Sequence, residues 1–328
     1  INIGICYNYF EVKNMGYDGT NYLPKNTSKT KLIEFIKMLG FRGQGNDYYF
    51  FKDEDYKYLF GVILKIEKAE DSLLVHTRNP IYSSDYDLKY QNYVMKQIKQ
   101  YFGGYFYSDY GKNRYFPENI EKTTPAERGC YAAYFRLSNL FSHIRFLVNN
   151  YNEDENVAKM MEYFGSPSGT ALLSNISTTY ISSIIENYFR QLYVVLLKYS
   201  DKKERLIASV RVNNFDLFEV SESKLSIEEA VALAKSFQNI NKINAYFMEI
   251  DKRIDIHGML SKPYHRRKET LYETLDRILE HRHSLVHRMN IDIGYKKEDV
   301  LKDINSVEVA LTKVYQHICC VFEWECRV

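Results

Sequence analysis

The sequence predicts a small α+β domain followed by a mainly α-helical bundle. In residues 1–120, short segments rich in Tyr, Phe, Val and Ile alternate with two segments of helical period. After residue 166, nearly every apolar pattern has the period of a helix. A length of 328 residues also exceeds what one hydrophobic core usually serves. We expect an α+β domain over 1–120, a helical connector over 121–165 and a helical domain over 166–328.

The α+β domain is expected to sense or regulate, or to position a substrate. Apolar spacing predicts helices over Thr30–Leu39 and Asp87–Phe102, the second ended by two glycines. Aromatic and β-branched segments predict strands over Tyr48–Phe51, Tyr56–Ile66, Leu73–Thr77 and Tyr105–Tyr107. The chain holds 30 tyrosines but 6 prolines. An AT-rich coding sequence explains that bias; the alternative is a tyrosine-lined surface for a ligand or RNA, because aromatic faces stack on bases.

The second half predicts a series of helices. A long pattern begins at Pro125 and runs through Leu147. Further helices are expected over Asn156–Phe164, Leu172–Tyr199, a segment after Ser226, Ile240–Ile250, about 269–289 and Lys296–Trp324. Ser226 and Glu229 have the spacing of a capping box. Glu186 and Arg190 stand four residues apart, a spacing that allows an ion pair. Residues 201–224 are polar and predict a partly ordered loop.

Composition narrows the possible functions. The net charge of +2 gives no basic field over the whole chain, so any nucleic-acid site must be a local patch. Five scattered cysteines without a CxxC pair disfavour a disulfide framework or a zinc ribbon, and they favour a reducing compartment. Apolar runs are too short to span a membrane, and the first residues lack a signal-peptide pattern. We expect a cytoplasmic protein with no membrane partner.

The segment from Glu280 to Asp292 concentrates titratable side chains on an amphipathic helix. At about 100° per residue, one apolar stripe forms, with Arg282 near its centre. The stripe comprises Leu271, Leu275, Ile278, Leu279, Leu285 and Val286. An arginine in a packing face is costly unless its guanidinium is paired or faces a polar cleft. Arg282 therefore needs an explanation.

Glu280, His283 and His287 fall within about 60° of one another on an adjoining face. Three interpretations compete. The first is a mixed-charge surface helix with one snorkelling arginine. The second is a metal site, since two histidines one turn apart have ligand spacing, although no third ligand stands at a persuasive position. The third is metal-free phosphodiester cleavage: RNA supplies its own 2′-hydroxyl nucleophile, so a base, an acid and a cation suffice.

The residues Arg282 to His287 form an R-x4-H motif within the pattern ExRHxLVH, followed by Asp292. This pattern resembles the signature of the HEPN superfamily (higher eukaryotes and prokaryotes nucleotide-binding), and most of all its RiboL-PSP-type members. The helix that contains Ile185–Phe189 resembles the first core helix of that family. The resemblance covers roughly residues 166 to 328, and it implies an HEPN-like helical bundle.

The resemblance implies a metal-independent endoribonuclease that needs no cofactor and whose active site forms between two R-x4-H motifs in a homodimer. By the same resemblance, His287 would be the main acid/base and Arg282 would stabilise the phosphorane-like charge, with His283 and Glu280 assisting. The expected products carry a 2′,3′-cyclic phosphate.

Basic residues near the motif are candidates for RNA contacts. Arg266, Arg267 and Lys268 could hold flanking phosphates, although a solvated start of the helix explains them equally well. Arg288 is a further candidate for RNA binding, although it lies on a less favourable face; His265 and His281 are also nearby on less favourable faces.

The family context suggests a toxin of a toxin–antitoxin pair or an abortive-infection, anti-phage effector. Expected partners are RNA, a second copy of the chain, and an antitoxin or phage-derived trigger. The alternative is a non-catalytic HEPN-like module that binds a nucleotide or a protein.

Overall fold

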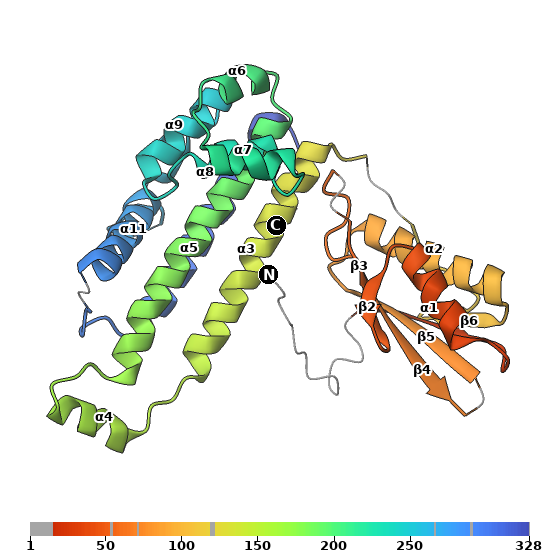
Figure 1. Ribbon diagram of the computed structural model, residues 1–328. Coiled ribbons are helices and arrows are strands. Elements are labelled where there is room, and N and C mark those ends of the chain that lie inside the picture. Colours follow the sequence, from red (N-terminus) through yellow and green to blue (C-terminus); the bar gives the residue numbers. More distant parts are fainter. Residues whose placement is uncertain are drawn as a thin grey trace. The chain divides into compact units, whose positions relative to one another are not determined.

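The computed structural model describes residues 16–52, 55–70, 72–118, 122–265, 267–288 and 291–327. The chain forms two compact units that divide between Thr124 and Pro125 (Figure 1). The first contains an antiparallel sheet and the second is helical, so the predicted fold class is confirmed. Within the described residues, no helix has the length and apolar character needed to cross a membrane.

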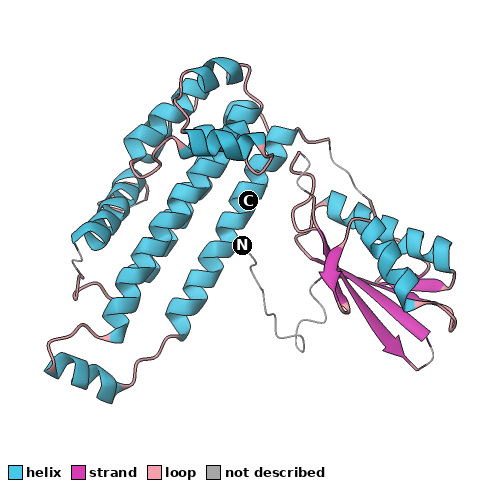
Figure 2. Cartoon of the chain, in the orientation of Figure 1, coloured by secondary structure: helices cyan, strands magenta, loops and turns pink. Residues whose placement is uncertain are grey.

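The described residues of the first unit form a seven-stranded sheet in the order β2-β3-β4-β5-β1-β6-β7, and every pair is antiparallel. Its elements are β1 (Gly16–Tyr22), α1 (Lys29–Met38), β2 (Arg42–Gln44), β3 (Asp47–Phe50), β4 (Val62–Ala69), β5 (Ser72–Pro80), α2 (Asp85–Phe102), β6 (Tyr105–Ser108) and β7 (Gly111–Lys112). Both helices lie on one face of the sheet (Figure 2).

The core of this unit lies between the helices and that face. Leu32 of α1 and Val94 of α2 are completely buried against Leu64 and Val75 of the sheet. Along β5, buried and half-buried residues alternate, because successive side chains of a strand point to opposite faces. The other face of the sheet therefore carries its own set of side chains, which the helices do not cover.

The first unit departs from the predictions in its strands. Three strands were not predicted: β1, which lies inside the sheet between β5 and β6, and the short strands β2 and β7. The strand predicted from Tyr56 begins only at Val62, because the preceding residues form a loop around a buried carboxylate. Asp87 accepts hydrogen bonds from the backbone N–H groups of Leu59 and Phe60, at 3.1 Å each, and of Gly61 at 2.7 Å.

The second unit is built around the long helix α5, which packs against α3, α11 and α12. Its helices are α3 (Pro125–Asn150), α4 (Glu155–Tyr163), α5 (Gly169–Lys198), α6 (Lys203–Ala208), α7 (Asn214–Ser221), α8 (Ile227–Leu233), α9 (Ile240–Ile250), α10 (Ile256–Leu260), α11 (Leu271–Arg288) and α12 (Lys297–Phe322). The predicted helices of this half are confirmed. The loop predicted over 201–224 is wrong, because α6 and α7 lie within it.

Helix α3 was predicted as part of a connector over 121–165, whereas it belongs to the compact helical unit. The ring of Tyr134 on α3 stacks on Tyr315 of α12, with centroids 4.6 Å apart. Leu137, Phe141 and Ile144 are buried along the same helix. This apolar stripe completes the packing of the bundle, so the unit begins at Pro125 rather than near residue 166.

The predicted capping box at the start of α8 is confirmed. The Ser226 hydroxyl accepts a hydrogen bond from the Glu229 N–H at 3.2 Å, and the Glu229 carboxylate accepts one from the Ser226 N–H at 2.8 Å. We expect Ser226→Ala to lower the free energy of unfolding by about 1 kcal/mol, as is usual for a lost N-cap. Urea unfolding measures the change. Ser221→Ala is the control, since among the described residues that hydroxyl bonds only to the Phe218 carbonyl in the preceding turn. An equal loss in both variants would contradict the capping argument.

Candidate functional site

The C-terminal half of α11 lies where the buried stripe of that helix ends. Leu275, Ile278 and Leu279 are at most 5% exposed, whereas Val286 is 45% exposed and Leu285 is half-buried. The predicted apolar stripe is therefore buried only in its first part. Arg282 lies on the turn between these two regions, at the edge of the hydrophobic core.

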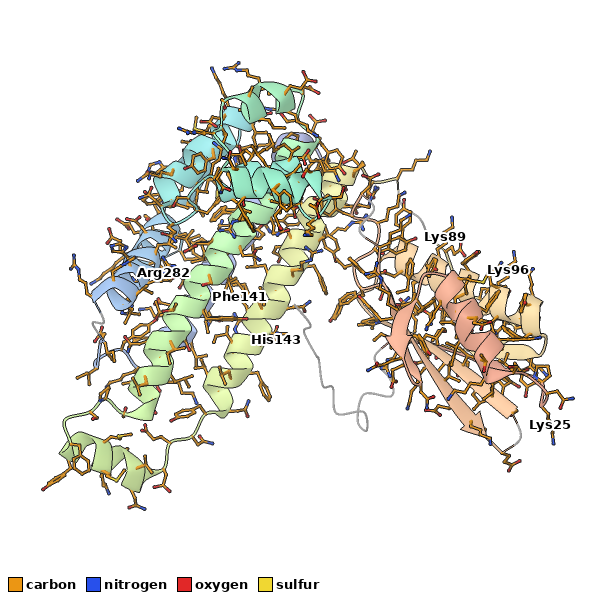
Figure 3. The ribbon with its side chains drawn as sticks, in the orientation of Figure 1. Lys25, Lys89, Lys96, Phe141, His143 and Arg282 are labelled. Carbon is orange, nitrogen blue, oxygen red and sulfur yellow. The ribbon has the colours of Figure 1, made fainter. Side chains whose placement is uncertain are left out.

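Arg282 points toward α5 and meets a carboxylate there (Figure 3). Its Nη1 lies 3.8 Å from Oε1 of Glu186, and the two side chains are 20% and 13% exposed. This distance is an ionic contact that is too long for a hydrogen bond. One turn earlier on α11, the Ser182 hydroxyl of α5 donates to the Ile278 carbonyl at 3.3 Å, which joins the same two helices. The sequence anomaly at Arg282 thus has a partner inside the chain.

The ionic contact between Arg282 and Glu186 does not satisfy all the hydrogen-bonding atoms of the two side chains. Nε of Arg282 and Oε1 of Glu186 are both buried without a hydrogen-bond partner. Buried polar atoms of this kind are rare in native proteins, and each costs about 1–3 kcal/mol. Because Nε is buried, it cannot itself reach an anion outside the chain; such a contact must come from the part of the side chain that is exposed, 20% of its surface.

The predicted i, i+4 partner of Glu186, Arg190, lies elsewhere. Its guanidinium carbon is 6.0 Å from the ring centroid of Phe237. Glu186 instead serves α11, a role that the sequence analysis did not assign to it. The sequence feature that could have indicated Glu186 is Arg282 itself, because an arginine in an apolar stripe is less costly when a carboxylate on the facing helix pairs with it.

His283 and His287 lie side by side on the exposed flank of α11. Their ring centroids are 4.4 Å apart and their planes differ by 47°. Glu280 is also exposed, one turn before His283. The structure thus brings together the residues that the sequence grouped on this face, and two imidazoles can act on one reacting group.

His281 has a different environment. It lies about 200° around the helix from His283, and its ring meets Tyr295 edge-on with centroids 5.2 Å apart. Burial lowers the pKa of His281, against the raising effects of Asp292 and Asp303. This histidine is therefore neutral at pH 7 and belongs to the packing between α11 and its neighbours.

An open hollow of about 420 Å³ lies beside this histidine. Its lining comprises His281, Ser284, Ile291, Asp292, Ile293 and Gly294. The Asn175 amide of α5 fixes the segment after α11, because it donates to the Asp292 carbonyl at 2.9 Å and accepts from the Asp292 N–H at 3.0 Å. Asn175 is a second positioning residue that the sequence did not indicate.

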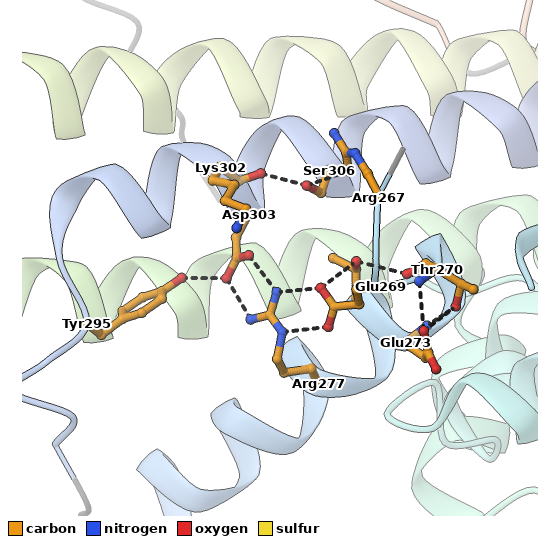
Figure 4. Close-up of polar contacts among 10 residues, drawn as sticks. Arg267, Glu269, Thr270, Glu273, Arg277, Tyr295, Lys302, Asp303 and Ser306 are labelled. Atoms are coloured by element: carbon orange, nitrogen blue, oxygen red, sulfur yellow. Dashed lines mark hydrogen bonds and ion pairs between the residues drawn. The ribbon is translucent and has the colours of Figure 1, made fainter. Parts of the chain in front are cut away.

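An ion-pair network joins α11 to α12 (Figure 4). Arg277 donates to both carboxylate oxygens of Asp303, at 2.7 and 3.0 Å, and to both of Glu269, at 2.9 and 3.3 Å. The Tyr295 hydroxyl donates to Asp303 at 2.7 Å. Burial raises the pKa of Glu269, but hydrogen bonding to Arg277 and its charge outweigh this and hold that pKa below its usual value. The network fixes the helix that carries the motif.

The candidate RNA-binding residues lie near the two ends of α11, the first group just before Leu271, where the helix begins. Arg266 lies outside the described residues. Arg267 donates to the Ser306 hydroxyl of α12 at 2.9 Å and lies 5.4 Å from the Tyr264 ring centroid, whereas Lys268 is exposed. Arg288 is exposed at the other end of this 18-residue helix, about 27 Å away at 1.5 Å per residue. The two groups could therefore contact only well-separated phosphates.

A metal ion at His283 and His287 would need further ligands. Among the residues that the structure describes, no three His, Cys, Asp or Glu side chains lie close enough to hold one. The described part of the chain thus offers this histidine pair no third side-chain ligand.

The geometry of α5 and α11 carries the functional argument by itself. None of the protein-family models, curated proteins or solved structures compared with the chain matches it.

Proposed function

We propose that the helical unit is a metal-independent endoribonuclease of the HEPN type. The observation that carries this proposal is a single stretch of α11 that combines two exposed histidines, with ring centroids 4.4 Å apart, and an arginine at the core edge whose side chain is 20% exposed. Transesterification of RNA needs a base, an acid and a cation at the phosphate, because the nucleophile belongs to the substrate. This stretch supplies all three.

In the proposed reaction, His287 removes the proton of the 2′-hydroxyl as the bond from the 2′-oxygen to phosphorus forms. The bond from phosphorus to the 5′-oxygen breaks, and this leaving oxygen takes a proton from a second imidazole, His283 or His287 of another copy. Arg282 stabilises the charge on the non-bridging oxygens, and Glu280 assists the histidines. The products are a 2′,3′-cyclic phosphate and a 5′-hydroxyl.

A homodimer is part of this proposal. The region around the end of α11 exposes apolar side chains: Val286 is 45% exposed, Ile291 38%, Ile293 72% and Ile176 of α5 64%. The contact between Asn175 and Asp292 holds the segment of Ile291 and Ile293 beside the turn of Ile176. Exposed apolar side chains in one region favour protein–protein contact. A two-fold contact there would bring two copies of the motif together.

The proposed biological role is that of a cytoplasmic toxin or abortive-infection effector. In this role, an antitoxin or a phage-derived trigger would act through the first unit, which would restrain or release the ribonuclease. A separate compact unit with its own core suits such a regulatory part.

RNA cleavage in the presence of EDTA tests the proposed function. We expect the purified full chain to cut RNA at an unchanged rate with the chelator present, and to leave 2′,3′-cyclic phosphate and 5′-hydroxyl ends. Light scattering after size exclusion should give the mass of a dimer. Intact RNA together with a formed dimer would count against the enzyme, and cleavage that EDTA abolishes would favour a metal site at His283 and His287.

A second candidate is a non-catalytic HEPN-like module that binds a nucleotide or a protein. One observation favours it: Glu186 already compensates the charge of Arg282 within the chain, so the arginine could serve the packing of α5 and α11 alone. Binding of a mononucleotide or a partner protein, with no RNA cleavage under any condition, would support this alternative.

A further inference from the structure

The face of the sheet that α1 and α2 leave uncovered carries an ordered array of side chains. Residues paired across antiparallel strands share a face. Thr20 of β1 pairs with Tyr107 of β6 and with His76 of β5, His76 pairs with Lys65 of β4, and Tyr107 pairs with Lys112 of β7. One row across the sheet is therefore Lys112, Tyr107, Thr20, His76 and Lys65. These five residues are cations, hydroxyl groups and one imidazole, and beyond Lys65 the row continues to Asp47 of β3.

Three tyrosines cluster at one end of this array. Tyr22 pairs with Tyr105, and their rings stack with centroids 5.0 Å apart and planes 12° apart. The ring of Tyr107 meets both of them edge-on at 5.9 Å. Tyr105 is 37% exposed and Tyr107 is 45% exposed. The sheet thus presents aromatic rings to solvent on two neighbouring strands.

One cation, Lys112, lies directly beside this tyrosine cluster. Nζ of Lys112 lies 4.4 Å from the ring centroid of Tyr105, and Lys112 forms no ion pair with a described residue. Farther along the face, the carboxylate of Glu67 is already engaged, by Lys65 at 2.8 Å and by His76 at 3.3 Å. The cation beside the tyrosines therefore remains available. Two carboxylates also lie close to Tyr107: Asp18, which is 3.8 Å from Arg78, and Asp109, which accepts a hydrogen bond from the Asp18 N–H at 3.0 Å.

We propose that this open face binds single-stranded RNA. Tyr107 stacks on an unpaired base. Lys112 moves off the ring of Tyr105 to contact a phosphate, and that ring then stacks on a second base. Aromatic rings on a sheet next to a cation suit this ligand, because every base offers a π-face and the backbone is anionic. Duplex RNA would keep its bases stacked inside and could not use the rings. The inference deepens the proposed ribonuclease and rests on it for one point, that the bound strand is the substrate.

Fluorescence anisotropy with a labelled 2′-O-methyl oligouridine tests the inference on the full chain. This probe has no free 2′-hydroxyl, so binding is measured apart from cleavage. We expect Tyr105→Ala with Tyr107→Ala to weaken binding by a factor of about 100, since stacking contributes about 1–3 kcal/mol per base. Replacing both by phenylalanine should retain binding, because the rings remain. Lys112→Ala should reduce the salt dependence of the affinity.

Tyr93→Ala is the matched control. Tyr93 lies on α2, on the face of the unit that the helices occupy, and is 44% exposed, close to the exposure of Tyr107. Its replacement should leave binding unchanged. The inference fails if the wild-type chain does not bind the oligonucleotide, if Tyr93→Ala weakens binding equally, or if duplex RNA binds as well through the same tyrosines. Cleavage without such binding would overturn this inference alone, whereas binding without cleavage would overturn the ribonuclease alone.

Discussion

Replacing His287 by alanine is expected to lower the rate of RNA cleavage by about 10²–10⁴-fold, the usual contribution of one general acid or base. Arg282→Ala should lower it by about 10²–10³-fold, as the loss of one electrostatic group at a developing charge does. The measurement is the single-turnover rate with enzyme in excess, which isolates the chemical step. Both variants should still form the dimer.

His281→Ala is the control for the first of these variants. His281 lies on the same helix, but its ring packs against Tyr295 on the other flank. The variant should cut RNA at nearly the wild-type rate at a temperature well below its Tm. If His281→Ala lost as much activity as His287→Ala, the assignment of the acid/base to the exposed flank would be wrong.

Arg282→Lys separates charge from geometry. Lysine keeps the positive charge near Glu186 but lacks the planar fork that contacts two phosphate oxygens at once. The rate of this variant should fall between those of wild type and Arg282→Ala. A full recovery would mean that only the charge of residue 282 matters, and no recovery would mean that the guanidinium itself is required.

How much of the fold follows from the sequence depends on where the stabilising contacts come from. The predicted helix Thr30–Leu39 matches α1 (Lys29–Met38) because its apolar spacing decides which face is buried. In strand β1, with the sequence GYDGTNY, two glycines, an aspartate and an asparagine interrupt the strand-forming Tyr and Thr residues. Its position is set by neighbours: a Cβ at Gly19 would lie 2.4 Å from Sδ of Met95 and 2.9 Å from Oγ1 of Thr77. Glycine allows α2 to approach the sheet there, which local propensity cannot reveal.

In the candidate site, too, features within one helix follow from the sequence, whereas contacts between helices do not. The proximity of His283 and His287 follows from the geometry of one helix, and so does the position of Arg282 on the buried stripe. The identity of its partner does not, because Glu186 reaches it through the packing of α5 on α11. Arg267 was predicted to bind phosphate from its place in a basic segment, but packing between helices gives it a hydrogen bond to Ser306 of α12 instead.

Arg277→Ala is expected to lower the free energy of unfolding by about 2–3 kcal/mol. Removing one partner of a fully buried ion pair costs about 3–5 kcal/mol, because the other charge stays buried and uncompensated. Asp303 fits that case, with its side chain 6% exposed, but Arg277 is 43% exposed. Water can therefore reach part of the space that the guanidinium leaves, which reduces the cost. Urea unfolding of the full chain measures it.

Arg253→Ala provides a matched control. Arg253 also pairs with an aspartate, Asp251, at 2.8 Å, but its side chain is 64% exposed and its partner is two residues away. Exposed ion pairs of this kind contribute little to stability, because water screens them. A loss in Arg277→Ala no larger than in Arg253→Ala would show that the network does not hold α11 on α12.

Stability and RNA cleavage are expected to depend on different residues of α11. Arg277 lies more than one turn before Arg282 and contacts α12 through Asp303, whereas His283 and His287 face solvent. At a temperature well below its Tm, Arg277→Ala should therefore retain RNA cleavage while its resistance to urea falls. His287→Ala should show the reverse, because an exposed histidine contributes little to packing. Parallel losses of stability and activity in both variants would mean that the motif acts only through the fold of α11.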